Sequence, residues 1–109
     1  MGQYFYVINL DKKQFLNPHT FKDGAKLLEF GCSADGTMTA LALLLRQSSE
    51  SGGGDYQGDS ELVGSWAGDR IAIVGDYDDS KLYEIAGKEY DDVSNTIFEV
   101  MKEKRIIRN

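Results

Sequence analysis

The chain has 109 residues and a net charge of −6, and its apolar fraction of 41% and charged fraction of 28% exclude a disordered chain and indicate one globular domain over residues 1–109. Its single cysteine, Cys32, excludes an internal disulfide, and a core of this size needs no metal or disulfide for stability. The first residues lack the pattern of a secretory signal and no apolar run approaches the ~20 residues that cross a bilayer, so we expect a cytoplasmic protein without a membrane partner.

The N-terminal part of the chain predicts two strands and a helical turn. Residues 4–10 carry apolar side chains on both faces, which indicates a strand in the interior of a sheet. Residues 14–16 are expected to return as a short antiparallel partner that ends before Pro18. Residues 25–30 predict a helical turn, which Gly31 ends.

The middle of the chain predicts the central helix. From Thr37 to Leu45 apolar side chains lie nearly all round the helical circumference, so this helix is expected to be buried on most sides against the sheet. The polar, glycine-rich residues 46–58 then predict a surface loop.

The C-terminal half predicts a hairpin and two more helices. Residues 71–74 are expected to form a strand, with Gly68 and Asp69 turning a preceding strand into it. Residues 76–79 end that strand and open a short helix, and residues 91–104 predict the last helix from their three- and four-residue apolar spacing. Residues 106 and 107 are expected to add a short strand. The resulting fold class is α+β, a mostly antiparallel sheet with two principal helices packed on it.

Negative charge is concentrated between residues 55 and 92, where eleven acidic residues face three basic ones, whereas residues 1–54 are neutral. Such a surface repels the phosphate backbone, which argues against direct binding of nucleic acid and favours a protein partner with a basic surface. The alternative is that the charge serves only solubility. We expect the binding surface on a rim that would gather six residues, Asp55, Trp66, Asp69, Asp76, Asp78 and Asp79.

Three other patterns leave chemical alternatives open. Cys32 precedes the start of the central helix, and the only histidine, His19, is the candidate base for a cysteine nucleophile oriented by an aspartate. Paired carboxylates in residues 76–79 resemble the Mg²⁺-holding acids of nucleotidyltransferases. The strand over residues 71–74 and the absence of a basic residue beside these acids oppose that function. We therefore expect no bound metal. Trp66, between two glycines, is expected either to expose a ring face or to be buried.

The strings MGQYFYVINLDKKQFLNPHTF, EFGCSADGTMTALALLL and GSWAGDRIAIVGDY resemble a group of small proteins from bacteria and their phages that have no assigned activity. The similarity covers most of the chain and supports the single-domain prediction. It implies no activity, cofactor or catalytic residue.

With one histidine, one cysteine and no cofactor motif, the sequence favours a small acidic binding or regulatory protein over an enzyme. The specific hypothesis is inhibition of a host defence protein by a phage or mobile-element product. The alternative is a small-molecule or nucleotide binder, or a small enzyme, with a site near Trp66 and residues 76–79 or at Cys32. The oligomeric state stays open.

Overall fold

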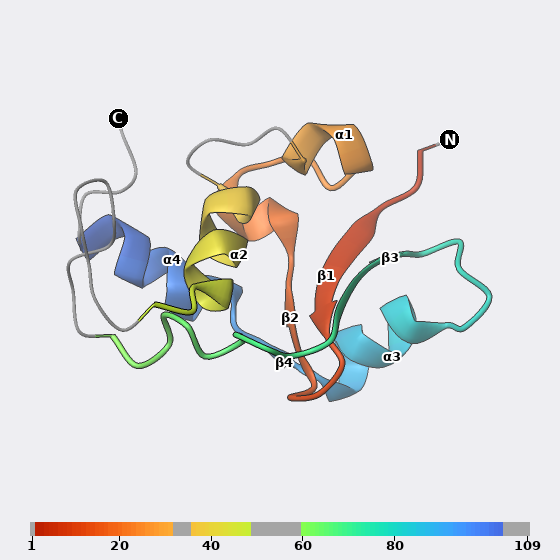
Figure 1. Ribbon diagram of the computed structural model, residues 1–109. Helices are drawn as coiled ribbons and strands as arrows, with labels where there is room; N and C mark the ends of the chain where they lie inside the picture. The colour runs from red at the N-terminus through yellow and green to blue at the C-terminus, as the bar shows by residue number, and fades with distance from the viewer. Residues whose placement is uncertain (1, 32–35, 49–59, 104–109) are drawn as a thin grey trace.

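The centre of the fold is a four-stranded sheet with the strand order β3-β1-β2-β4. It is seen in a computed structural model that describes residues 2–31, 36–48 and 60–103 (Figure 1). The strands are β1 (Phe5–Asn9), β2 (Gln14–Leu16), β3 (Ile71–Gly75) and β4 (Asp91–Asp92). β1 pairs antiparallel with both β2 and β3, which confirms its interior position, whereas β2 and β4 are parallel. The sheet is therefore mixed.

Helices cover both faces of this sheet. A 3₁₀ helix η1 (Pro18–Phe21) and a short α1 (Leu27–Phe30) follow β2, and the longer helices are α2 (Thr37–Leu45), α3 (Leu82–Glu89) and α4 (Ser94–Glu103). Figure 1 shows α2 and α4 on one side of the strands and α3 on the other. The α+β prediction is confirmed, with α2 and α4 as the principal helices of the larger core.

The two faces are apolar because neighbouring residues of a strand point to opposite sides. Val7 and Leu16 are paired across β1 and β2, and both belong to the core that α2 and α4 cover. Ile8 and Phe15, the next pair along the two strands, belong to the smaller core beneath α3. A strand with apolar residues on both faces therefore needs a helix on each face.

The predicted hairpin around Gly68 and Asp69 is wrong. Residues 61–68 form successive turns, and β3 pairs with β1. The physical reason lies at the end of α2, whose last carbonyls need hydrogen-bond donors. The N–H groups of Gly64 and Trp66 donate to the carbonyls of Leu43 and Leu44 at 2.8 and 2.9 Å, so this segment caps a helix.

The last helix begins later than predicted. Asp91 and Asp92 form β4, since the N–H of Asp91 donates to the carbonyl of Lys13 at 3.0 Å. Asp92 Oδ1 then accepts the N–H of Ser94 at 2.9 Å, at the start of α4. The terminal strand predicted at residues 106 and 107 lies outside the described residues. Within the described part of the chain, no helix has the length and apolar character that crossing a membrane requires.

Candidate functional site

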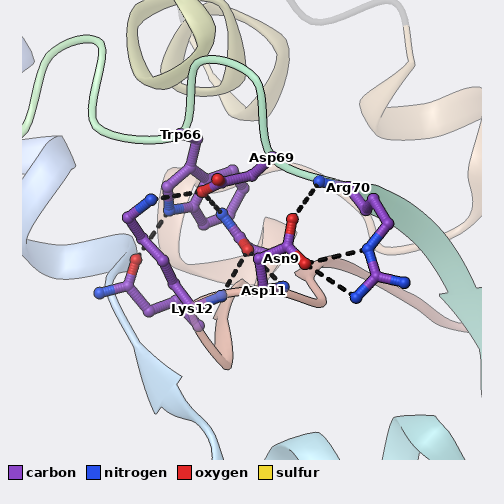
Figure 2. A network of polar contacts seen from close by, with 7 residues as sticks. Asn9, Asp11, Lys12, Trp66, Asp69 and Arg70 are labelled. Atoms are coloured by element: carbon purple, nitrogen blue, oxygen red, sulfur yellow. Dashed lines mark hydrogen bonds and ion pairs between the residues drawn. The ribbon is translucent and has the colours of Figure 1, made fainter.

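A network of polar contacts joins the turn after β1 to the residues before β3 (Figure 2). Its centre is Asn9, the last residue of β1, whose side chain is fully buried. Asn9 Oδ1 accepts the N–H groups of Asp11 and Lys12 at 2.9 and 2.8 Å, which shapes the turn. Its Nδ2 donates to Oδ2 of Asp69 at 2.8 Å. One buried amide therefore holds two segments about sixty positions apart.

Two ion pairs surround this amide. Lys12 Nζ contacts Oδ2 of Asp69, and Arg70 Nη2 lies 2.8 Å from Oδ1 of Asp11. The amide of Asn9 and then the ammonium of Lys12 hold the pKa of Asp69 below its ordinary value. The backbone N–H of Arg70, followed by its guanidinium, lowers the pKa of Asp11 in the same way. Asp69 was predicted to contact a partner protein, but its carboxylate is bound by Asn9 and Lys12 of the same chain.

Trp66 belongs to the core. Its side chain is fully buried among residues of the larger core, and its Nε1–H donates to Oε1 of Gln14 at 2.7 Å. The alternative in which one ring face is exposed is therefore wrong. The indole cannot contact a partner, and its polar edge is satisfied inside the fold.

The predicted rim is not one surface. Asp69 comes just before β3 and Asp76 directly after it, so the five residues of β3, at about 3.3 Å each, hold them apart. Trp66 lies on the Asp69 side of that strand, which also separates it from residues 76–79. Asp55 lies outside the described residues. The structure therefore brings together Trp66 and Asp69 in one region and Asp76, Asp78 and Asp79 in another.

Two of the aspartates after β3 have local structural contacts. Asp76 closes the end of the sheet, because its N–H donates to the carbonyl of Tyr4 at 2.9 Å and its Oδ1 accepts the N–H of Tyr4 at 3.1 Å. Asp78 Oδ2 accepts the N–H of Ser80 at 3.0 Å, and the hydroxyl and N–H of Ser80 lower the pKa of this carboxyl. Among the described residues, no three histidine, cysteine or acidic side chains converge as a metal site would need.

The cysteine hydrolase suggested by the sequence is not assembled in the described part of the chain. Cys32 lies outside it. His19 is exposed in η1, and its ring meets Tyr4 edge to face, with 6.0 Å between the ring centroids. Asp69 is paired elsewhere and Asp76 contacts the backbone of Tyr4, so no described aspartate is hydrogen-bonded to the imidazole.

The predicted rim did not include the carboxylates that follow residues 76–79, although the sequence placed them in the acidic stretch. We define the acidic face by seven residues on the loop after β3, on α3 and on β4: Asp76, Asp78, Asp79, Glu84, Glu89, Asp91 and Asp92. All are exposed except the half-buried Asp76, and the same stretch of chain holds two lysines, Lys81 and Lys88. The signal was present in the sequence as the acidic residues of a short helix and its flanks.

The residues of the acidic face lie on α3 and on the two segments that flank it in the chain, and Asp91 and Asp92 point to opposite sides of the sheet. α3 contacts β1, β3 and β4, so it runs beneath the strands from one edge of the sheet to the other (Figure 1). Within the described chain, none of the seven carboxylates forms an ion pair with a lysine or arginine. At the other end of β3, by contrast, both Asp11 and Asp69 are paired with cations.

Comparison of the chain with protein-family models, with curated proteins and with solved structures gives no match.

Proposed function

We propose that the protein is a non-catalytic binding protein that docks its acidic face on a basic surface of another protein. The observation that supports this function is that some carboxylates of the chain are paired with cations and others are not. Asp11 and Asp69 are neutralised by Arg70 and Lys12, whereas the seven carboxylates of the acidic face have no cation partner among the described residues.

Unpaired like charges have a consequence for association. They repel one another in the folded protein, and together they raise the negative potential outside α3. A basic partner relieves this repulsion and is steered to the surface by the same potential, which speeds encounter at low ionic strength.

The more specific form of the proposal concerns the partner. A protein that binds the phosphate backbone of nucleic acid presents the basic surface that an acidic face of this kind fits. Inhibition of such a host defence protein by a phage or mobile-element product is the biological role we propose, and it requires neither a cofactor nor a catalytic group in this chain.

The test uses carboxylates that have no hydrogen bond to another residue. Asp76, Asp78 and Asp92 each accept a backbone N–H, so their replacement would also disturb local structure. Glu84 and Glu89 on α3 are exposed and avoid this problem. The variant is Glu84→Gln with Glu89→Gln.

The control is Glu61→Gln with Glu99→Gln, which removes the same charge from exposed positions outside the acidic face, although Glu99 also lies 3.6 Å from Nζ of Lys102. A partner captured from host extract is purified, and its association rate is measured against salt for all three proteins. We expect the α3 variant to associate roughly fivefold more slowly at low salt and to lose part of its salt dependence, with the control close to wild type. Equal rates for both variants would contradict docking through the acidic face.

A further inference from the structure

The two edges of the sheet differ in a way that the proposed function does not use. β4 forms one edge with only two residues, both aspartates, and short charged strands of this kind resist pairing with another chain. β3 forms the other edge with five residues, Ile71, Ala72, Ile73, Val74 and Gly75. Within the described chain β3 pairs only with β1. An apolar strand with one unpaired side is a template for a further strand.

The register shows which backbone groups point outward from this edge. The N–H of Leu10 donates to the carbonyl of Arg70, and the N–H of Asp76 donates to the carbonyl of Tyr4, both at 2.9 Å. Hydrogen-bonded pairs alternate along an antiparallel ladder, so Ala72 and Val74 bond β1, and the N–H and carbonyl groups of Ile71 and Ile73 point outward. The side chain of Ile73 is 44% exposed beside them.

We propose that a second copy of the chain occupies this edge, with the two β3 strands antiparallel about a two-fold axis at Ile73. In this register Ile73 of one copy lies opposite Ile73 of the other, and Ile71 lies opposite Gly75. Gly75 is buried and its carbonyl already accepts the N–H of Asp78 at 3.1 Å, so the bonds between copies centre on Ile73. The N–H and carbonyl of Ile73 then bond their counterparts, and both exposed isoleucines lose contact with water. The interface is isologous, as in most homodimers.

Charge complementarity favours a second copy over a foreign strand. Arg70 and Asp76 each lie three residues from Ile73, on opposite sides. The two-fold axis therefore places Arg70 of each copy opposite Asp76 of the other, on the same face of the joined sheet. The side chain of Arg70 is 76% exposed and can reach across while it stays close to Asp11. Opposite charges in cross-strand pairs stabilise a sheet. β3 and its flanking residues are therefore complementary in charge to a second, antiparallel copy of themselves.

This dimer does not depend on the proposed basic partner, but it changes the surface that such a partner would meet. The axis runs perpendicular to the joined sheet, so α3 of both copies lies on the same side. The dimer therefore presents two acidic faces in one direction, each with Asp76 paired to Arg70 of the other copy, which a monomer cannot do.

The first experiment measures the dissociation constant of the purified full-length dimer by sedimentation over a concentration series. Ile73→Lys places two ammonium groups opposite each other at the axis and is expected to raise that constant by about tenfold or more. The control is Leu28→Lys on α1, where an equally apolar side chain is 82% exposed outside the sheet edge, and it should leave the constant unchanged. A wild-type chain that stays monomeric, or a dimer that tolerates Ile73→Lys while still folded by circular dichroism, would overturn the proposal.

The second experiment tests the register by exchanging charges. Arg70→Glu and Asp76→Lys should each weaken the dimer, since each places like charges in opposition, and the double variant should recover most of the wild-type affinity. Because these replacements also remove the Asp11–Arg70 pair and the contact of Asp76 with Tyr4 within each copy, the comparison uses variants whose circular dichroism matches wild type. Within one copy these residues are roughly 20 Å apart at about 3.3 Å per residue, so recovery requires contact between copies. Failure of the double variant to recover would contradict this register even if the chain is a dimer. Loss of partner binding with an intact dimer would instead count only against the proposed function.

Discussion

The indole nitrogen of Trp66 donates a hydrogen bond to Oε1 of Gln14, with 2.7 Å between the two atoms, and so ties the segment that caps α2 to the second strand of the sheet. This bond lies beside the Asn9 network in Figure 2. Together the two arrangements use side-chain amides, the buried Asn9 and the half-buried Gln14, to hold residues 61–70 against the sheet. They identify this region as structural, and the docking surface that we propose lies elsewhere, on the acidic face.

Gln14→Ala is expected to lower the free energy of unfolding by about 1–3 kcal/mol, because it leaves the buried indole N–H without an acceptor. Trp66 is the only tryptophan, so its fluorescence reports the urea transition directly. In a Trp66→Phe background, followed by circular dichroism, the same replacement should cost clearly less. An equal cost in both backgrounds would show that the hydrogen bond contributes nothing to stability.

Asn9→Ala is expected to cost about 2–3 kcal/mol of unfolding free energy, since it removes acceptors from two turn amides and the donor to Asp69. Asn17→Ala is the matched comparison. Asn17 also accepts a backbone N–H, that of His19 at 3.1 Å, but at the exposed start of η1. Its loss should cost about 1 kcal/mol. Similar values for the two variants in chemical denaturation would contradict a special role for the buried amide.

Gly64 and Gly68 both have φ +83°, but they differ in their surroundings. A Cβ on Gly64 would lie 2.8 Å from the carbonyl oxygen of Arg46, whereas a Cβ on Gly68 would meet nothing within 4 Å. Gly68→Ala should therefore cost only the backbone strain of a left-handed alanine, about 1–2 kcal/mol. Gly64→Ala should cost more, because backbone at the end of α2 must also move. Thermal denaturation of both variants measures the difference, and a larger loss for Gly68→Ala would refute this account.

The pH dependence of stability follows from Asp11 and Asp69, whose pKa values are lowered in the folded state. A carboxyl with a lowered pKa stabilises the fold above its unfolded pKa of about 3.9, and this contribution is lost as the pH falls through the folded pKa. The free energy of unfolding should therefore decrease as the pH is lowered from about 5. Asp69→Asn should flatten that decrease relative to wild type. An unchanged slope in denaturant titrations at several pH values would exclude Asp69 from the effect.

Local patterns in the sequence were enough for most elements. Apolar residues on both faces of residues 4–10 predicted an interior strand, and β1 does pair on both sides. The apolar run from Thr37 predicted α2, but its burial is less complete than expected, because only Thr37, Ala40, Leu41 and Leu44 are buried. Charge is likewise readable from the sequence, so the acidic character of residues 76–92 was available without coordinates.

What only the tertiary structure decided are the contacts between distant segments. Nothing near Trp66 in sequence indicates that Gln14 will accept its N–H, or that the turns around Gly64 will cap α2 and form no strand. The sequence also does not show which aspartates lie together. The length of β3 separates Asp69 from Asp76, and the lysine that neutralises Asp69 comes from another turn. Local propensity acts over a few residues, whereas the satisfaction of buried donors and charges depends on whichever segments the packed core brings together.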